Sequence, residues 1–314
     1  MNRIRGNDMN YRIVADSSSN VLSMDNPHYF SVPMKVRAEK EYIDDARLDV
    51  AQMVEDLKKH KGTSGSSCPN VGEWLDAFGD ADFVFGTTMS KGLSGSYNAA
   101  CQAADTFMEE NPGKKAYIFN TLSAGPQQAF LNEKVIELVE QGLDFETVKE
   151  KALEYYKNTH ILFCLESMMN LARNGRTSMA VAKIAGMLGI RVCGDVKAGM
   201  ITPVHKPRGA KKTTETLVEM MKERGFYDGA QLRIAHCFAE TQAQDLANAT
   251  LAQFPNARIT IEPTTALCSF YAEAGGLMIG FEGGYNAEND TEKFGYGFNA
   301  RAEKRGRFLL YDDR

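Results

Sequence analysis

The stretch FVFGTTMSKGLSGSYNAACQAADTFM, residues 83–108, decides the fold prediction for this chain. It begins with the apolar run Phe83-Val84-Phe85, which is typical of a buried strand. Its last part, residues 97–108, repeats apolar residues at helical spacing. Between them lies the loop 90–96, with the sequence SKGLSGS, whose glycines free the backbone and whose serines can cap a helix. The stretch therefore predicts a strand, a loop and a helix, in that order.

The loop 90–96 has two interpretations that the stretch alone leaves open. The first N–H groups of a helix have no partner within the helix, and the helix dipole favours negative charge there. A phosphate or a carboxylate could therefore bind at this turn without a dedicated cationic residue. Glycine and serine also precede many helices only to cap them.

The same order of strand and helix recurs through the first half of the chain. Strands are predicted at 11–15 and 115–120, and helices follow the second of these strands as far as residue 158. Such alternation favours a mostly parallel sheet. Hydroxyl-rich segments follow the strands at Asp16, Ser94 and Thr121, and they should gather at the carboxyl edge of the sheet, where ligands bind in such folds.

The pattern changes after residue 159. Two short strands within 191–204 are joined near Lys197, which predicts a hairpin, and further strands alternate with helices up to residue 262. We therefore expect an α/β protein of two domains. The second domain should be α+β, with a mixed or antiparallel sheet. The predicted divisions are a leader at 1–10, an N-terminal α/β domain at 11–159, a C-terminal α+β domain at 160–284 and a polar tail at 285–314.

Composition narrows the function classes. A chain of 314 residues can form two ordinary domains, and a net charge of −5 argues against a nucleic-acid partner. The six cysteines show no C-x-x-C pair, which favours free thiols in a reducing cytosol. No apolar run approaches the roughly 20 residues of a spanning helix, so we expect a cytoplasmic protein without an integral membrane segment.

Several chemistries lack their sequence signature. The first strand is not followed by G-x-G-x-x-G, the P-loop lysine pattern is absent, and the five histidines show no pair at ligand spacing. We therefore expect no cofactor and no metal. The hydroxyl-rich segment 62–69 is either a solvated linker or a second wall of an anion site. The basic segment 206–212 is either a solvated turn or a contact to an acidic partner or a phosphate.

Four motifs together resemble the DegV family. They are Thr63-Ser64, the element SKGLSGSY at 90–97, Arg176-Thr177 and GGLMIGF at 275–281, and the resemblance spans residues 11–284. It implies a bacterial two-domain protein that encloses one long-chain fatty acid in an internal tunnel, with the ligand between the two domains. Such proteins resemble the binding subunit of a fatty acid kinase, which presents the carboxylate to a separate ATP-using subunit for conversion to acyl phosphate.

The resemblance also implies roles for particular residues. Thr63 and Ser94 would donate hydrogen bonds to the carboxylate, with the Gly95 backbone beside them, and Arg208 matches a family arginine associated with the kinase encounter. Many members have a histidine that touches the carboxylate, but here Cys268 takes its place. The family pattern Thr-Ser-Gln-Pro-Ser is also altered, to TSGSS at 63–67. The possible secondary contacts are Ser64, Ser96, Cys268 and Ser269.

Three functions stay open at this point. The leading hypothesis is a non-catalytic lipid-binding subunit that delivers a fatty acid to a kinase. The second is a self-sufficient phosphotransferase or hydrolase with Ser94 as its nucleophile, although Gly92-Leu93-Ser94-Gly95 does not match G-x-S-x-G. The third is a sensor of another small carboxylate.

Overall fold

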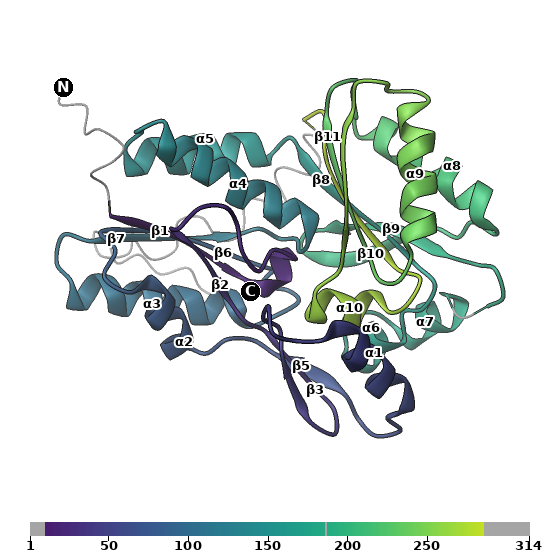
Figure 1. Ribbon diagram of the computed structural model, residues 1–314, viewed down its shortest axis with the longest axis horizontal. Helices are drawn as coiled ribbons and strands as arrows, with labels where there is room; N and C mark the ends of the chain where they lie inside the picture. Colours follow the sequence, from purple (N-terminus) through teal and green to yellow (C-terminus); the bar gives the residue numbers. More distant parts are fainter. Residues whose placement is uncertain (1–9, 186, 286–314) are drawn as a thin grey trace, which may run out of the picture.

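The structure is a computed structural model that describes residues 10–185 and 187–285 (Figure 1). Apart from Asn10 and Tyr285, the predicted leader and the predicted polar tail lie outside the described residues. Two sheets of different topology lie side by side, and a small third sheet lies below them in the view of Figure 1. Within the described ranges, no helix is both long enough and apolar enough to span a membrane.

The N-terminal unit contains a parallel sheet of four strands. Its strand order is β2-β1-β6-β7, and every neighbouring pair runs parallel. The prediction of a mostly parallel sheet is therefore confirmed, because each strand returns through a crossover instead of a hairpin. The strands are β1 (Tyr11–Asp16), β2 (Tyr29–Val32), β6 (Phe83–Thr88) and β7 (Lys115–Asn120).

Helices cover both faces of this sheet (Figure 1). Successive strand residues point to opposite faces, so Val84 packs with the helices on one side and Phe85 with those on the other. Asp144 accepts a hydrogen bond from the Thr147 amide and so caps the start of α5. The helices are α2 (Val71–Phe78) and α3 (Ser96–Glu110) on one face, and α4 (Pro126–Glu140) and α5 (Phe145–Tyr156) on the other.

The C-terminal unit contains a mixed sheet of six strands, in the order β10-β9-β8-β13-β11-β12. Only β11 and β12 pair in parallel, so the expectation of a mixed or antiparallel sheet is confirmed. The predicted hairpin near Lys197 joins β9 to β10. The strands are β8 (Thr159–Leu165), β9 (Val192–Lys197), β10 (Met200–His205), β11 (Gln231–His236), β12 (Arg258–Pro263) and β13 (Leu277–Glu282).

One face of the mixed sheet packs against α8 (Ala210–Glu223) and α9 (Glu240–Leu251). Its other face turns toward α4 and the N-terminal unit (Figure 1). Two short helices follow β8, namely α6 (Met169–Arg173) and α7 (Met179–Ala185). After α7, residues 187–189 form a bend and a turn before Ile190.

A third sheet joins β3 (Lys35–Arg37) to β4 (Glu41–Ile43) and β5 (Gly65–Ser67), all antiparallel. It packs with α1 (Val50–Lys59) and α10 (Ala266–Ala272) around a common apolar cluster. The segment 65–67 looked like a loop because glycine and serine have low strand propensity. Pairing with β3 imposes the strand there.

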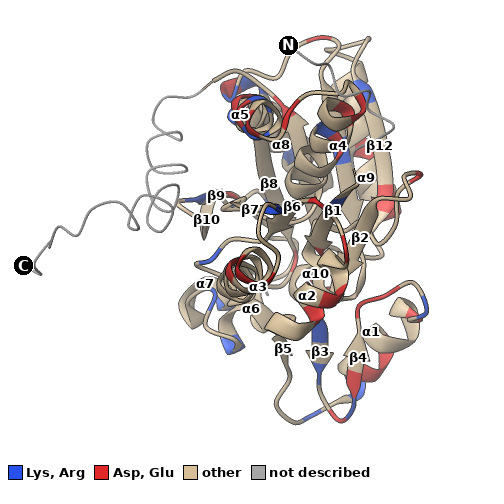
Figure 2. Cartoon of the chain, turned by 90° about the vertical axis from the view of Figure 1, so that its left-hand side faces the viewer, with Lys and Arg blue, Asp and Glu red and all other residues tan. Residues whose placement is uncertain are grey.

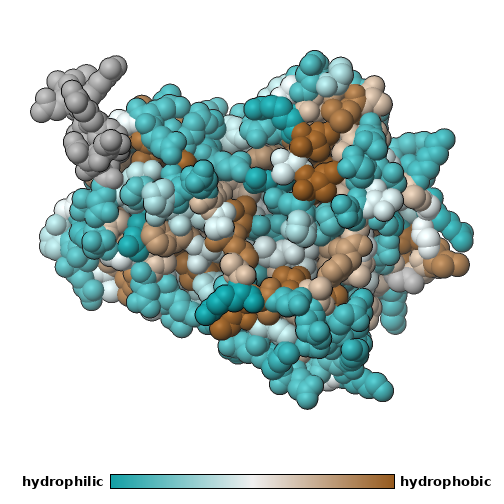
Figure 3. Space-filling model, viewed as in Figure 1, coloured by the Kyte–Doolittle hydropathy of each residue, from teal (hydrophilic) through white to brown (hydrophobic). Residues whose placement is uncertain are grey.

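Most large apolar side chains of the described residues are buried beneath the outer surface. Acidic and basic residues are interspersed on α5, where Lys149 pairs with Glu146 and Lys157 with Glu154 (Figure 2). Hydrophilic residues cover most of the face seen in Figure 3, and hydrophobic residues show as separate small patches.

Candidate functional site

A cavity lies where the mixed sheet faces the N-terminal unit and α10. The space between its lining side chains amounts to about 810 Å³, including the part that opens to solvent. Most of the lining is apolar, and much of it comes from strands of the mixed sheet, whose inward residues alternate with those that face α8 and α9. These strand residues are Ile161, Phe163, Leu165, Val196, Ile201 and Met278.

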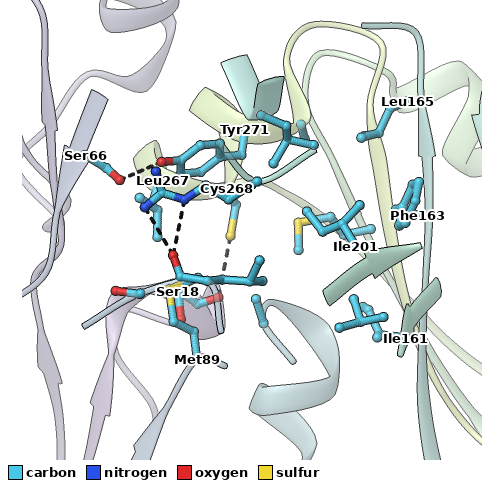
Figure 4. A pocket seen from close by; sticks show the side chains of 18 of the residues that line it. Ser18, Ser66, Met89, Ile161, Phe163, Leu165, Ile201, Leu267, Cys268 and Tyr271 are labelled. Carbon is cyan, nitrogen blue, oxygen red and sulfur yellow. Dashed lines mark hydrogen bonds between the residues drawn. The ribbon is translucent and has the colours of Figure 1, made fainter. Parts of the chain in front are cut away.

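The polar groups of the lining lie apart from these strand residues. In Figure 4, Ser66 and Tyr271 lie on one side of the cavity, whereas Phe163 and Leu165 lie on the other. Ser94 and Arg176 also line the cavity. The cavity is thus a mostly apolar space whose polar groups, Ser66, Ser94, Arg176 and Tyr271, lie toward one end, which we call the polar end.

Arg176 connects the C-terminal unit to the loop that begins α3. Its Nε and Nη2 atoms donate to the carbonyl oxygen of Leu93 at 3.2 and 3.1 Å, and its Nη1 donates to the carbonyl oxygen of Asn174 at 2.6 Å. The guanidinium carbon lies 5.6 Å from the centre of the Tyr271 ring, within the range of a cation–π contact. Arg176 therefore fixes the residue next to Ser94 and brings a positive charge to the polar end.

Ser94 is placed by the start of α3. Its amide donates to the Ser90 carbonyl oxygen at 3.1 Å, and its Oγ accepts a hydrogen bond from the Ser96 amide at 3.3 Å. Within the described ranges, the Ser94 hydroxyl hydrogen has no acceptor, so it is available to a ligand. The predicted strand, loop and helix are confirmed, since β6 leads through this loop into α3.

Asp16, at the end of β1, organises the segments behind the polar end. It is fully buried and accepts hydrogen bonds from the Ser18 hydroxyl, the Gln128 side-chain amide, the Ser96 hydroxyl and the Met89 amide. Burial raises the pKa of the Asp16 carboxyl, although these four donors act in the opposite direction. The Ser96 hydroxyl donates to Asp16 at 2.6 Å, and this bond holds the start of α3 against the end of β1.

Asp44 fixes the position of α10. The amides of Ala266 and Leu267 donate to its carboxylate at 2.7 and 3.1 Å, and the Ser17 hydroxyl donates at 2.8 Å. Burial raises the pKa of Asp44 to about 6, although these donors favour the charged form. Because Asp44 caps this helix, α10 presents Leu267, Cys268 and Tyr271 to the cavity.

Cys268 lines the cavity with its donor already engaged. Its thiol donates to the carbonyl oxygen of Ser18 at 3.6 Å, a normal length for a sulfur donor. Burial raises the pKa of the Cys268 thiol well above its usual value, and the nearby Asp44 and Asp16 act in the same direction. The side chain is therefore a neutral thiol, which disfavours a role as a nucleophile.

Comparison with known proteins adds a finding that is independent of this geometry. A family model described as "Uncharacterised protein, DegV family" matches residues 10–282. The chain belongs to the DegV family. The resemblance that the four sequence motifs indicated is thereby confirmed.

Relatives of this DegV chain include proteins of known structure. A DegV domain-containing protein of Streptococcus pneumoniae is 36% identical over 280 residues, which cover 87% of this chain and 99% of the relative. The structure of the Streptococcus pneumoniae Fatty Acid Kinase (Fak) B3 protein, loaded with linoleic acid, matches with a TM-score of 0.85 and 36% identity, covering 88% of this chain and 100% of that one.

A second solved structure is that of a DegV family protein from Eubacterium eligens loaded with heptadecanoic acid. It matches with a TM-score of 0.84 and 34% identity, and the match covers 87% of this chain and 100% of that protein. Both comparisons span the N-terminal and C-terminal units together, so they support the arrangement of the two sheets as well as each sheet alone.

Several residues that the sequence singled out lie elsewhere in this DegV chain. Thr63 is exposed and does not line the cavity, and its carbonyl oxygen lies 3.1 Å from His60 Nε2. Ser64 does not line the cavity either. Arg208 is exposed and adjoins Gly209, the residue that precedes α8.

Among the other predicted residues, Ser94 and Cys268 line the cavity. Gly95 is exposed and adjoins Ser94. Ser269 does not line the cavity, and its hydroxyl lies 2.7 Å from that of Thr264, to which it is hydrogen-bonded. Ser66 belongs to the hydroxyl-rich segment 62–69, which was predicted as a possible wall of an anion site without singling out this serine, whereas nothing in the sequence pointed to Tyr271. Arg176 was expected only as part of a family motif.

Proposed function

We propose that this chain binds one long-chain fatty acid in the cavity. The acyl tail would lie along the apolar strands of the mixed sheet, and the carboxylate would lie at Ser66, Ser94, Arg176 and Tyr271. The observation that carries this proposal is the one-sided polarity of an otherwise apolar cavity. It is supported by two relatives above 30% identity whose structures contain linoleic acid and heptadecanoic acid.

The physical terms agree with such a ligand. Burying an acyl chain contributes about 0.8 kcal/mol per methylene group, so a long tail supplies most of the affinity. A carboxylate removed from water needs hydrogen-bond donors to offset its desolvation. The Ser94 hydroxyl and the remaining N–H groups of Arg176 can supply them at the polar end. Ser66 replaces Thr63 in this proposal, because Thr63 does not line the cavity.

The variant Ser94→Ala tests the carboxylate position. We expect its affinity for linoleic acid to fall about tenfold or more, because a hydrogen bond to a charged group contributes about 1.5–3 kcal/mol. Isothermal titration calorimetry of delipidated protein measures the change. Thr63→Ala removes a hydroxyl outside the cavity and should keep the wild-type affinity. Unchanged affinity in Ser94→Ala would mean that this loop only caps α3.

We further propose that the bound acid is presented to a separate kinase subunit, cytoplasmic like this chain, which converts the acid to acyl phosphate. Support comes from the similarity to the Fak B3 protein and from the exposed Arg208, which is available to a partner. In the described part of the chain, Ser94 has no hydrogen bond to a histidine or a carboxylate that would activate it as a nucleophile. This observation disfavours the self-sufficient phosphotransferase or hydrolase.

Incubation with ATP and linoleic acid separates these functions. We expect the isolated chain to form no acyl phosphate, and we expect product to appear when a fatty acid kinase catalytic subunit is added. Arg208→Ala should lower product formation in the complete mixture while leaving fatty-acid affinity unchanged, because Arg208 lies outside the cavity. Product from the isolated chain would favour the self-sufficient enzyme. Selective binding of a short acid would favour the sensor.

A further inference from the structure

We propose that the Tyr271 hydroxyl is a direct donor to the ligand carboxylate, with Ser66 as the residue that orients and strengthens it. This inference rests on the proposed fatty-acid binding and names a residue that determines its head-group specificity. Tyr271 lies on α10 and lines the cavity near Ser66, which lies on β5 (Figure 4).

The position of Tyr271 follows from how α10 is anchored. Asp44 accepts hydrogen bonds from the first two amides of this helix, and Asn20 Oδ1 accepts one from the Thr265 amide at 2.7 Å. Residues 267, 268 and 271 share one face because neighbours three and four apart are adjacent on a helix. All three line the cavity. The anchored end of α10 thus directs the Tyr271 ring toward the ligand space.

The hydrogen count at the pair leaves one donor available. Ser66 Oγ and Tyr271 OH lie 2.7 Å apart, and either could donate to the other. The pair has two hydroxyl hydrogens, and their mutual bond uses one of them. Within residues 10–185 and 187–285, neither hydroxyl has another hydrogen-bond partner. The Cys268 thiol, by contrast, already donates to the Ser18 carbonyl oxygen. Tyr271 and Ser66 therefore retain a hydrogen that a carboxylate oxygen can accept.

The direction of the pair follows from donor strength. A phenol is a stronger acid than an aliphatic alcohol, so it forms the stronger hydrogen bond to a charged acceptor. If Ser66 donates to the Tyr271 oxygen, polarisation along the chain also strengthens the Tyr271 O–H as a donor. The Arg176 guanidinium, 5.6 Å from the ring centre, adds a positive charge on the same side. The order is thus Ser66 to Tyr271 to ligand.

The test compares a fatty acid with a fatty alcohol of the same chain length, using the full chain after delipidation. Tyr271→Phe keeps the ring and its contact with Arg176 but removes the hydroxyl. We expect its affinity for the acid to fall about tenfold or more, and the preference for acid over alcohol to fall roughly fivefold or more, since neutral acceptors form weaker bonds. Ser66→Ala should lose less affinity for the acid than Tyr271→Phe does, because Tyr271 keeps its own hydroxyl hydrogen.

Tyr227→Phe is the matched control, because Tyr227 is 51% exposed and lies outside the cavity. It should bind both ligands as the wild type does. Equal losses of acid and alcohol in Tyr271→Phe would show a packing role only and would overturn the inference, as would unchanged affinity for the acid. If the wild-type chain itself binds no fatty acid, the proposed function fails and this inference fails with it. If the wild type binds the fatty acid and Tyr271→Phe binds it with the same affinity, only this inference is rejected.

Discussion

At the scale of single residues, two buried carboxylates order the polar end of the cavity. Asp16 ties β1 to the start of α3 through Ser96, and Asp44 ties the small third sheet to α10. Both are surrounded by donors that belong to different segments of the chain. A carboxylate accepts several hydrogen bonds at once, which suits it to joining segments that are remote in sequence.

Asp44 gives a prediction about pH and stability. Its pKa of about 6 in the folded chain exceeds the ordinary 3.8, so the folded state favours the protonated form. The stabilisation is fully present below about pH 4 and is lost as the pH rises through 6, a change of roughly 3 kcal/mol for a shift of this size. Urea unfolding of wild type and Asp44→Asn at a series of pH values measures it. Parallel stability curves for the two proteins between pH 4 and 7 would contradict the prediction.

At the scale of elements, the mixed sheet depends on a buried ion pair between β9 and the end of α8. Arg224 pairs with Asp195, and their side chains are only 13% and 7% exposed. Gly194, the neighbour of Asp195, leaves space for the Phe163 ring, which lines the cavity. The ion pair thus joins the end of α8 to β9, a strand of the sheet that lines the cavity.

Arg224→Ala should destabilise the fold strongly, by about 3–5 kcal/mol, because it leaves the Asp195 charge buried without its partner. The free energy of unfolding in urea measures the loss. Lys58→Ala is the control, since it removes an exposed pair with Glu55 within α1 and should change stability by less than about 1 kcal/mol. Similar small effects for both variants would show that Arg224 contributes little.

Helices and strands with a clear hydrophobic period could be predicted from the sequence. Residues whose role depends on strand pairing or on contacts between remote segments could not. The strand, loop and helix at 83–110 follow from local pattern, and so does the hairpin at β9 and β10. Local pattern does not decide whether Thr63 or Ser66 lines the cavity, because the two hydroxyl residues look alike in sequence. The choice depends on the register that sets Ser66 opposite the buried Val36. Arg176 likewise acts on Leu93, 83 residues away in the chain.

At the scale of the whole molecule, the cavity exists only because both units contribute to it. Ser66 and Ser94 come from the N-terminal half, and Arg176 and the apolar strands come from the C-terminal half. The domain divisions at 159 and 160 stay a prediction, but β8 begins at Thr159, close to that boundary. A bound ligand would therefore contact both units at once and should stabilise their arrangement.

Native mass spectrometry of the purified full chain tests the central claim most directly. We predict a mass increase that corresponds to one long-chain fatty acid per chain, which disappears when the same sample is measured under denaturing conditions. After delipidation, the increase should return on addition of linoleic or heptadecanoic acid. A chain that stays at its unliganded mass with both acids in excess would contradict the account.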